Sequence, residues 1–225
     1  MAHPIFSDRT HAGRLLASEV VGRHLTPPVL VLGLPRGGVP VAYEVARALN
    51  APMDVMLVRK IGMPGQPELA IGAIASGSIV VHDAGRAEGA VANDRFQRLV
   101  EVQRRELERR ERLYRGDRGP LNLAGRTALL VDDGLATGAT MLAAIRAARK
   151  AAAAVVVVAA PIASREAVAL IDGEADEVVI LTTPPTLWAI GDWYEDFAQV
   201  EDDEVCRLLR ICGPVVAITY SRAPS

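Results

Sequence analysis

The sequence is poor in aromatic residues and in cysteine, and it has no long hydrophobic run. Aromatic side chains make up 4% of the 225 residues, and the two cysteines are Cys206 and Cys212. Because these cysteines lack metal-ligand spacing, the pattern argues against a disulfide framework and against a zinc site. The longest apolar run, 151–163, contains Pro161 and is far shorter than the roughly 20 residues that cross a bilayer.

A strong excess of charge of either sign is also missing. The net charge is −2 and the isoelectric point is near 6.1, so the balance does not require nucleic acid or an anionic membrane surface as partner. The N-terminal residues MAHPIFSDR lack the basic and then apolar pattern of a signal sequence. Since 50% of the residues are hydrophobic, the chain can bury one substantial core. We therefore expect a single soluble, cytoplasmic domain over 1–225.

The most informative stretch is 129–140, which reads LLVDDGLATGAT. Residues 127–131 are continuously apolar, as expected of a strand in a parallel sheet that is covered on both faces. Asp132 and Asp133 then lie at the carboxyl end of that strand. Ligands of open α/β sheets bind at this edge.

The residues after the acid pair are small or carry hydroxyl groups: Gly134, Ala136, Thr137, Gly138, Ala139 and Thr140. Small side chains let backbone N–H groups of the loop and of the next helix approach an anion. Carboxylates accept hydrogen bonds from neutral hydroxyls. A sugar phosphate satisfies both halves, although an ordinary strand, turn and capped helix with solvated acids is the simpler alternative.

A second glycine-rich loop follows the strand predicted at 29–34 and precedes a helix at 40–50. Gly37 and Gly38 allow a tight turn, and the Arg36 guanidinium can grip phosphate oxygens. By itself, this loop is equally compatible with a plain turn that carries a solvated arginine.

A third strand, at 54–58, leads into two adjacent cations, Arg59 and Lys60. These would repel each other at the sheet edge unless an anion neutralised them. Residues 61–67 are too rich in Gly and Pro for regular structure, and 69–81 predicts a hairpin.

Residues 92–115 predict the longest helix. Its Glu–Arg pairs at a spacing of four are Glu101–Arg105, Glu106–Arg110, Glu108–Arg112 and Glu111–Arg115. Its inner stripe is predicted as Phe96, Val100, Gln103, Leu107 and Tyr114. From 94 to 118 there are nine arginines and six acids. An RNA-binding face is one interpretation, but no aromatic residues alternate with the arginines, and a solvated, salt-bridged surface is favoured.

The remaining elements are a helix at 8–24, a helix at 140–150, a strand at 154–160, a helix from Ser164 to Ile171 and a strand at 177–181. Five strands separated mostly by helices indicate an α/β fold with a doubly wound five-stranded parallel sheet. Residues 182–200 then concentrate four aromatic residues: Trp188, Trp193, Tyr194 and Phe197. The simplest interpretation of these rings is a small core of their own. The acids at 201–204 complement the dipole of a last helix.

The 129–140 motif closely resembles the phosphoribosyl pyrophosphate motif of the type I phosphoribosyltransferase family. It is not a Walker loop, because no Gly-Lys-Ser/Thr follows the strand. The loop 35–38 and the Arg59-Lys60 pair resemble the pyrophosphate contacts of that family. Ala139 departs from the residues that many members have, at a position that varies.

The resemblance covers about 29–181 and implies a role for each motif. Asp132 and Asp133 would hold the ribose hydroxyls, Gly134 and 136–140 would wrap the 5′-phosphate, and Arg36, Gly37, Gly38, Arg59 and Lys60 would hold pyrophosphate. Residues 61–118 would supply a lid and a helical insertion, and 1–28 with 182–225 would form a hood over the acceptor. Mg²⁺ would bind through phosphoribosyl pyrophosphate and water, with no direct protein ligand.

The implied activity is phosphoribosyl transfer from phosphoribosyl pyrophosphate to a nitrogenous base, with Asp132, Asp133, Arg59 and Lys60 as the catalytic residues. We expect a homodimer without nucleic acid or membrane partners. A regulator that binds phosphoribosyl pyrophosphate or a nucleotide without turnover is the main alternative, and action on another phosphoester is a third.

The acceptor base is not specified by the motifs. Family members that act on 6-oxopurines commonly carry a carboxylate just before the threonine of the phosphate loop, where this chain has Ala136. Because alanine cannot exchange a proton, we predict weak or no turnover of hypoxanthine and guanine. Trp193 or Tyr194 is the predicted stacking wall for the base.

Overall fold

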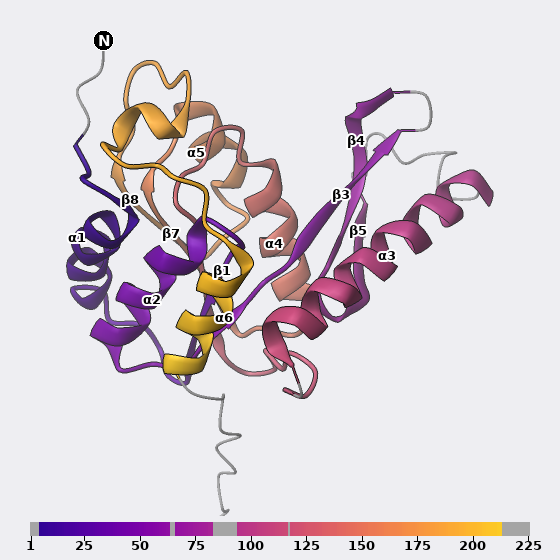
Figure 1. Cartoon of the computed structure of the whole chain (residues 1–225), viewed down its shortest axis with the longest axis horizontal. Coiled ribbons are helices and arrows are strands. Elements are labelled where there is room, and N and C mark those ends of the chain that lie inside the picture. Colours follow the sequence, from indigo (N-terminus) through magenta and orange to yellow (C-terminus); the bar gives the residue numbers. More distant parts are fainter. Residues whose placement is uncertain (1–4, 64–65, 83–93, 117, 213–225) are drawn as a thin grey trace, which may run out of the picture.

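Five parallel strands form the main sheet, in the order β2-β1-β6-β7-β8 (Figure 1). Their bounds are β1 Val29–Gly33, β2 Met53–Val55, β6 Thr127–Val131, β7 Val155–Ile162 and β8 Glu177–Thr182. The computed structural model describes residues 5–63, 66–82, 94–116 and 118–212. The predicted α/β class and five-stranded parallel sheet are confirmed.

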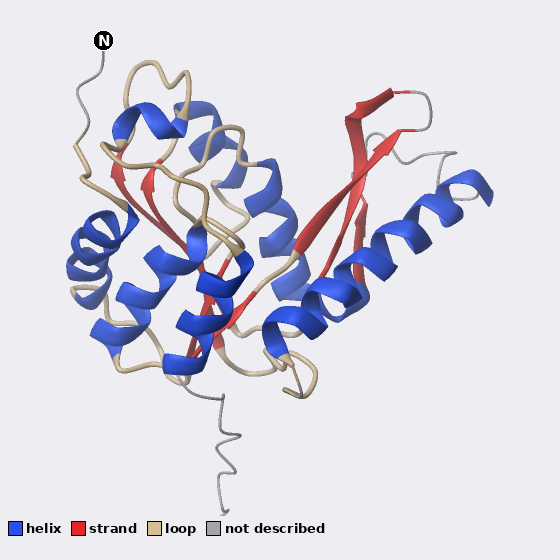
Figure 2. Ribbon diagram, viewed as in Figure 1, coloured by secondary structure: helices blue, strands red, loops and turns tan. Residues whose placement is uncertain are grey.

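Helices cover both faces of this sheet (Figure 2). The helices are α1 Arg9–Val21, α2 Gly38–Leu49, α3 Asp94–Arg115, α4 Ala139–Lys150, α5 Arg165–Ile171 and α6 Asp202–Ile211, of which α3 packs mainly on the second sheet described below. One core contains Val31 of β1 with Leu16 of α1 and Val45 of α2. The other contains Leu30 of β1 with Ile145 of α4. Neighbouring residues of β1 are thus buried on opposite faces, which explains its continuous apolar sequence.

Short polar side chains determine where two helices begin. Asp8 caps α1, since its Oδ1 accepts a hydrogen bond from the backbone N–H of His11 at 2.7 Å. Ser164 caps α5 through the N–H of Ala167 at 2.8 Å. The helix predicted at 40–50 begins earlier, at Gly38, which brings its first turn directly onto the loop after β1.

A second, antiparallel sheet contains β3 Val58–Met63, β4 Gln66–Ala75 and β5 Ile79–His82. The strand predicted at 54–58 is therefore wrong in its bounds, because β2 ends at Val55 and β3 starts a new sheet. The prediction of irregular structure over 61–67 is also wrong for its described residues, since β3 runs to Met63 and β4 begins at Gln66. The predicted hairpin is present between β4 and β5.

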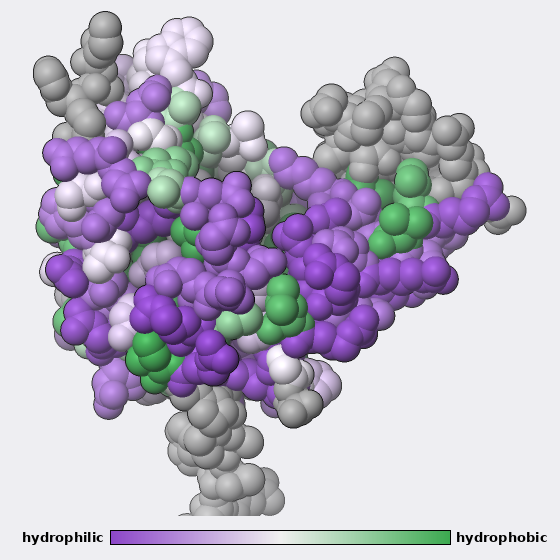
Figure 3. Space-filling model, in the orientation of Figure 1, coloured by the Kyte–Doolittle hydropathy of each residue, from purple (hydrophilic) through white to green (hydrophobic). Residues whose placement is uncertain are grey.

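The charged helix α3 packs beside this second sheet. Buried residues of its predicted inner stripe are Val100, Leu107 and Tyr114. Ion pairs at a spacing of four join Glu101 to Arg105 and Glu106 to Arg110, at 3.1 and 3.0 Å. Arg115 instead reaches the buried Asp54 at 3.0 Å. Figure 3 shows a largely hydrophilic surface over α3, and these pairs support the salt-bridged interpretation of it. Within the described ranges, no helix has both the length and the apolar character that crossing a membrane requires.

The N-terminal segment and the residues after β8 lie together as a hood over the main sheet. The backbone N–H groups of Ile5 and Phe6 both donate to the carbonyl of Trp193, at 3.1 Å. The buried members of the hood core are Phe6, Ala12, Ile162 and Tyr194, with Trp193 and Phe197 packed against them. Three of the four clustered aromatic residues, Trp193, Tyr194 and Phe197, thus belong to a core of their own, whereas Trp188 is exposed. All of 1–28, which includes α1, is predicted from the sequence to belong to the hood. In the structure, α1 packs instead on α2, β7 and β8 and belongs to the helical layer.

Candidate substrate-binding site

The loops after β1 and β6 meet at the carboxyl edge of the main sheet. The two strands are neighbours in the sheet but not in the sequence, so this is the point where the strand order reverses and where ligands bind in open α/β folds. The backbone N–H of Leu34 donates to the carbonyl of Val131 at 2.9 Å. A β-carbon on Gly38 would lie 2.6 Å from that same carbonyl oxygen, so the loops touch through backbone atoms.

The acid pair begins at this junction. Oδ1 of Asp132 accepts a hydrogen bond from the backbone N–H of Asp133 at 2.9 Å. Burial and the adjacent charge of Asp133 raise the pKa of Asp132 well above its ordinary value, while Arg9 opposes this shift. Two carboxylates therefore lie side by side, and the less solvated one is poised to hold a proton more tightly than a free aspartate does.

Asp133 is held by three neighbours that are distant in sequence. Its Oδ2 accepts a hydrogen bond from Arg9 Nε of α1 at 2.7 Å, and the side chains are 12% and 15% exposed for Arg9 and Asp133. The Tyr194 hydroxyl donates to the Asp133 backbone carbonyl at 2.7 Å. The carboxylate also lies against the Cα of Gly37, where a β-carbon would overlap it. The structure thus brings the predicted glycine loop and the predicted acid pair together.

The predicted phosphate loop is fixed at its base and open at its tip. Leu135 is buried and bridges to the end of β7, donating to the carbonyl of Ile162 at 2.9 Å. Ala136 and Thr137 are exposed. Gly138 has φ of 73°, a left-handed conformation that glycine adopts readily, and it starts α4. Backbone N–H groups at the start of such a helix favour an anion.

Ser164 is a site residue whose role the sequence did not reveal. Its hydroxyl donates to the carbonyl of Ala136 at 2.7 Å while accepting from Ala167 in its cap of α5. The predicted cap is therefore also a support for the phosphate loop. Because Ala136 and Ser164 are 28 residues apart, the local sequence around Ser164 indicates only its role as the cap.

The predicted cations Arg36, Arg59 and Lys60 are less closely associated with one another than the acid pair and the two loops are. Arg36 lies 3.7 and 3.8 Å from the carboxylates of Glu201 and Asp202 at the start of α6, and the peptide bond before it is cis. Arg59 and Lys60 are neighbours within β3 and so leave opposite faces of that strand. Arg59 Nε donates to Gln103 of α3 at 2.9 Å, and Lys60 is exposed. Their adjacency in sequence predicted that both cations bind the same anion, but β3 instead directs one cation to each of its faces.

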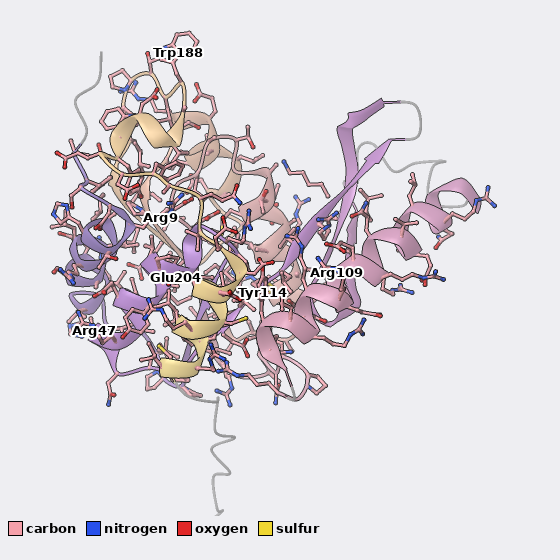
Figure 4. All side chains as sticks on the ribbon, in the orientation of Figure 1. Arg9, Arg47, Arg109, Tyr114, Trp188 and Glu204 are labelled. Carbon is pink, nitrogen blue, oxygen red and sulfur yellow. The ribbon has the colours of Figure 1, made fainter. Side chains whose placement is uncertain are left out.

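The two predicted stacking residues differ in their surroundings. Tyr194 is only 4% exposed, and its ring centroid lies 5.2 Å from that of Phe6 and 4.9 Å from that of Phe197. It belongs to the hood core, which corrects its prediction as a stacking wall, and burial raises the pKa of its hydroxyl. Trp193 is half-buried against the same core. Trp188, at the outer tip of the hood in Figure 4, is 89% exposed.

Known proteins resemble this chain along most of its length. A curated protein of Mycobacterium tuberculosis, from strains CDC 1551 and H37Rv, carries the name "Putative phosphoribosyl transferase". It is 47% identical over 211 residues, which cover 91% of this chain and 46% of the relative. The chain therefore spans about half the length of these curated relatives.

Solved structures agree with the observed architecture. The crystal structure of TT1426 from Thermus thermophilus matches with a TM-score of 0.81 at 44% identity, over 91% of this chain and 97% of that one. A protein from Neisseria gonorrhoeae, solved with bound ppGpp, has a TM-score of 0.52 at 15% identity, over 94% and 98% of the two chains, and supports the fold alone. The family model described as "Phosphoribosyl transferase domain" matches residues 10–202. This chain belongs to the phosphoribosyl transferase domain family.

Proposed function

We propose that the protein transfers a phosphoribosyl group from phosphoribosyl pyrophosphate to a nitrogen nucleophile and releases pyrophosphate. The observation that carries the proposal is the junction of the acid pair with the anion-binding start of α4 at one edge of the sheet. Carboxylates recognise hydroxyls, and the helix start recognises a phosphate. Ribose 5-phosphate is the simplest group with both features on one molecule.

In this proposal Asp132 and Asp133 bind the ribose hydroxyls, and 136–140 bind the 5′-phosphate. Arg36, with Gly37 and Gly38, faces the pyrophosphate side. Arg36 would exchange its distant acidic neighbours on α6, at 3.7 and 3.8 Å, for phosphate oxygens. A guanidinium suits this exchange because it stays charged and can bind two oxygens at once.

Mg²⁺ is part of the proposal as a companion of the substrate. No group of three or more His, Cys, Asp or Glu residues within the described ranges is arranged to hold a metal ion. The acid pair fits water-mediated contact with an ion that is carried on the pyrophosphate and ribose oxygens. Such an ion would neutralise charge on the departing pyrophosphate. The protein itself would act by positioning the ribose and by stabilising the leaving group.

The acceptor base, the homodimer and the cytoplasmic location stay predictions. Ala136 is exposed at the tip of the phosphate loop and offers no proton-exchanging group. We therefore propose that hypoxanthine and guanine are poor acceptors, with adenine, orotate, uracil or an uncommon base as candidates. With Tyr194 buried, Trp193 is the residue left from the two predicted stacking residues.

Calorimetric titration tests the binding step. Wild-type protein with Mg²⁺ should bind phosphoribosyl pyrophosphate, and Asp132→Ala should weaken binding about 10- to 100-fold through loss of hydrogen bonds to a charged acceptor. The variant Asp172→Ala, in the turn after α5, is a matched control for loss of an aspartate. Unchanged affinity in Asp132→Ala would contradict the proposed site.

Pyrophosphate release with a panel of bases tests turnover. Release with at least one base supports the transferase, and efficient conversion of hypoxanthine would refute the argument from Ala136. Tight binding without release for any base would favour a regulator that has kept the fold. Product analysis by mass spectrometry would detect action on another phosphoester.

A further inference from the structure

Arg9, the first residue of α1, links the hood to the acid pair through three contacts. Its Nε donates to Asp133 Oδ2 at 2.7 Å, and its Nη1 donates to the carbonyl of Ala198 at 2.7 Å. Its Cζ lies 3.8 Å from the centre of the Phe197 ring, which is a cation–π distance. Figure 4 shows Arg9 beside the chain that leads from the hood to α6. With stacking on one side and hydrogen bonds at two nitrogens, the guanidinium has little freedom to move.

The contact with Asp133 leaves part of that carboxylate available. A carboxylate offers about four acceptor positions. Arg9 occupies one of these positions, on Oδ2. The same oxygen lies nearest to Gly37, where even a β-carbon would overlap it. Arg9 and Gly37 together therefore determine the direction in which Oδ1 lies.

The charges around the acid pair explain why a cation is needed at this position. Asp132 and Asp133 are adjacent and poorly solvated, and Tyr194 is the other titratable group packed against them from the hood. Arg36 is turned toward the acids of α6. Arg9 is thus the cation in direct contact with the pair among the described residues.

We propose that Arg9 is a positioning residue that holds Asp133 ready to accept a ribose hydroxyl. This inference rests on the proposed function, because it assigns ribose to the acid pair. It makes a residue of the N-terminal helix, 124 positions before Asp133, part of the ribose subsite. The hood then affects sugar binding as well as covering the acceptor.

A double-mutant cycle tests this role with ribose 5-phosphate and inorganic pyrophosphate as separate calorimetric probes. Arg9→Gln should weaken ribose 5-phosphate binding about 10-fold and leave pyrophosphate binding unchanged, because one misplaced carboxylate affects only the sugar. In an Asp133→Asn background the same substitution should have little further effect, since the two residues act as a unit. Arg14→Gln on the same helix, where Arg14 is exposed and 3.5 Å from Glu44, is the matched control and should bind both probes normally.

The outcomes separate the inference from the proposed function. If wild-type protein binds no ribose 5-phosphate, both are overturned. If wild-type binds it and Arg9→Gln weakens both probes equally, or adds its full loss on top of Asp133→Asn, Arg9 has only a structural role and the proposed function stands. Thermal melting of all variants shows whether the hood has kept its fold.

Discussion

The close backbone approach of the two site loops can be tested by a single added methyl group, Gly38→Ala. Gly38 opens α2, where the helical backbone accepts alanine. Its β-carbon, however, would lie 2.6 Å from the carbonyl oxygen of Val131 and 2.8 Å from the Cα of Asp132. Both are backbone atoms at the end of a central strand, so neither can rotate away as a side-chain tip could.

The expected magnitude follows from two opposing terms. Placing alanine at a compatible helical position stabilises a protein by about 0.4–1 kcal/mol, because the unfolded chain loses freedom. Forcing a methyl group into a close-packed contact costs about 1–3 kcal/mol, or more where backbone must shift. The steric term should win, and we expect a net loss of about 1–2 kcal/mol in the free energy of unfolding.

Gly22→Ala is the matched control for this substitution. Gly22 ends α1 with φ of −67°, and a β-carbon there would lie no closer than 3.4 Å to another atom. This variant should be neutral or slightly stabilised. Urea unfolding followed by circular dichroism gives both free energies, and calorimetry should show weaker ribose 5-phosphate binding only for Gly38→Ala. If both variants were equally stable and bound equally well, the loops could not be in the contact described.

Four further substitutions, with Ser18→Ala as a control, test the acid pair, the phosphate loop and the cations. Asp132→Asn should stabilise the protein near neutral pH. Because the pKa of Asp132 is raised in the folded state, the wild-type protein loses stability as the pH rises above about 4. Urea unfolding should therefore show that the gain from Asp132→Asn disappears below that pH. Ser164→Ala should cost about 1 kcal/mol as a lost cap and weaken inorganic phosphate binding, whereas Ser18→Ala, at an exposed position of α1, should do neither. Lys60→Ala should weaken pyrophosphate binding more than ribose 5-phosphate binding, while Arg59→Ala should chiefly lower the melting temperature through its lost bond to α3. Equal effects of Lys60→Ala on both ligands would exclude a direct role.

The sequence by itself determined the architecture of the main sheet and the location of the acid pair. A short, continuous apolar run such as 127–131, followed by turn-forming residues, favours a strand buried on both faces, so its end places Asp132 at the ligand edge. Gly138 marks the turn into α4 because its left-handed backbone disfavours other residues. These features depend on a few neighbouring residues and are therefore local.

Only the tertiary structure decided which distant residues complete the site. Arg9 meets Asp133, and Ser164 meets the phosphate loop, across long separations for which local pattern contains no information. The burial of Tyr194 likewise depends on Phe6 from the other end of the chain. The second sheet was missed at 61–67 because Gly and Pro disfavour regular structure locally, whereas pairing between β3 and β4 supplies the backbone hydrogen bonds. Long-range contacts decide these features since each local segment is compatible with several partners.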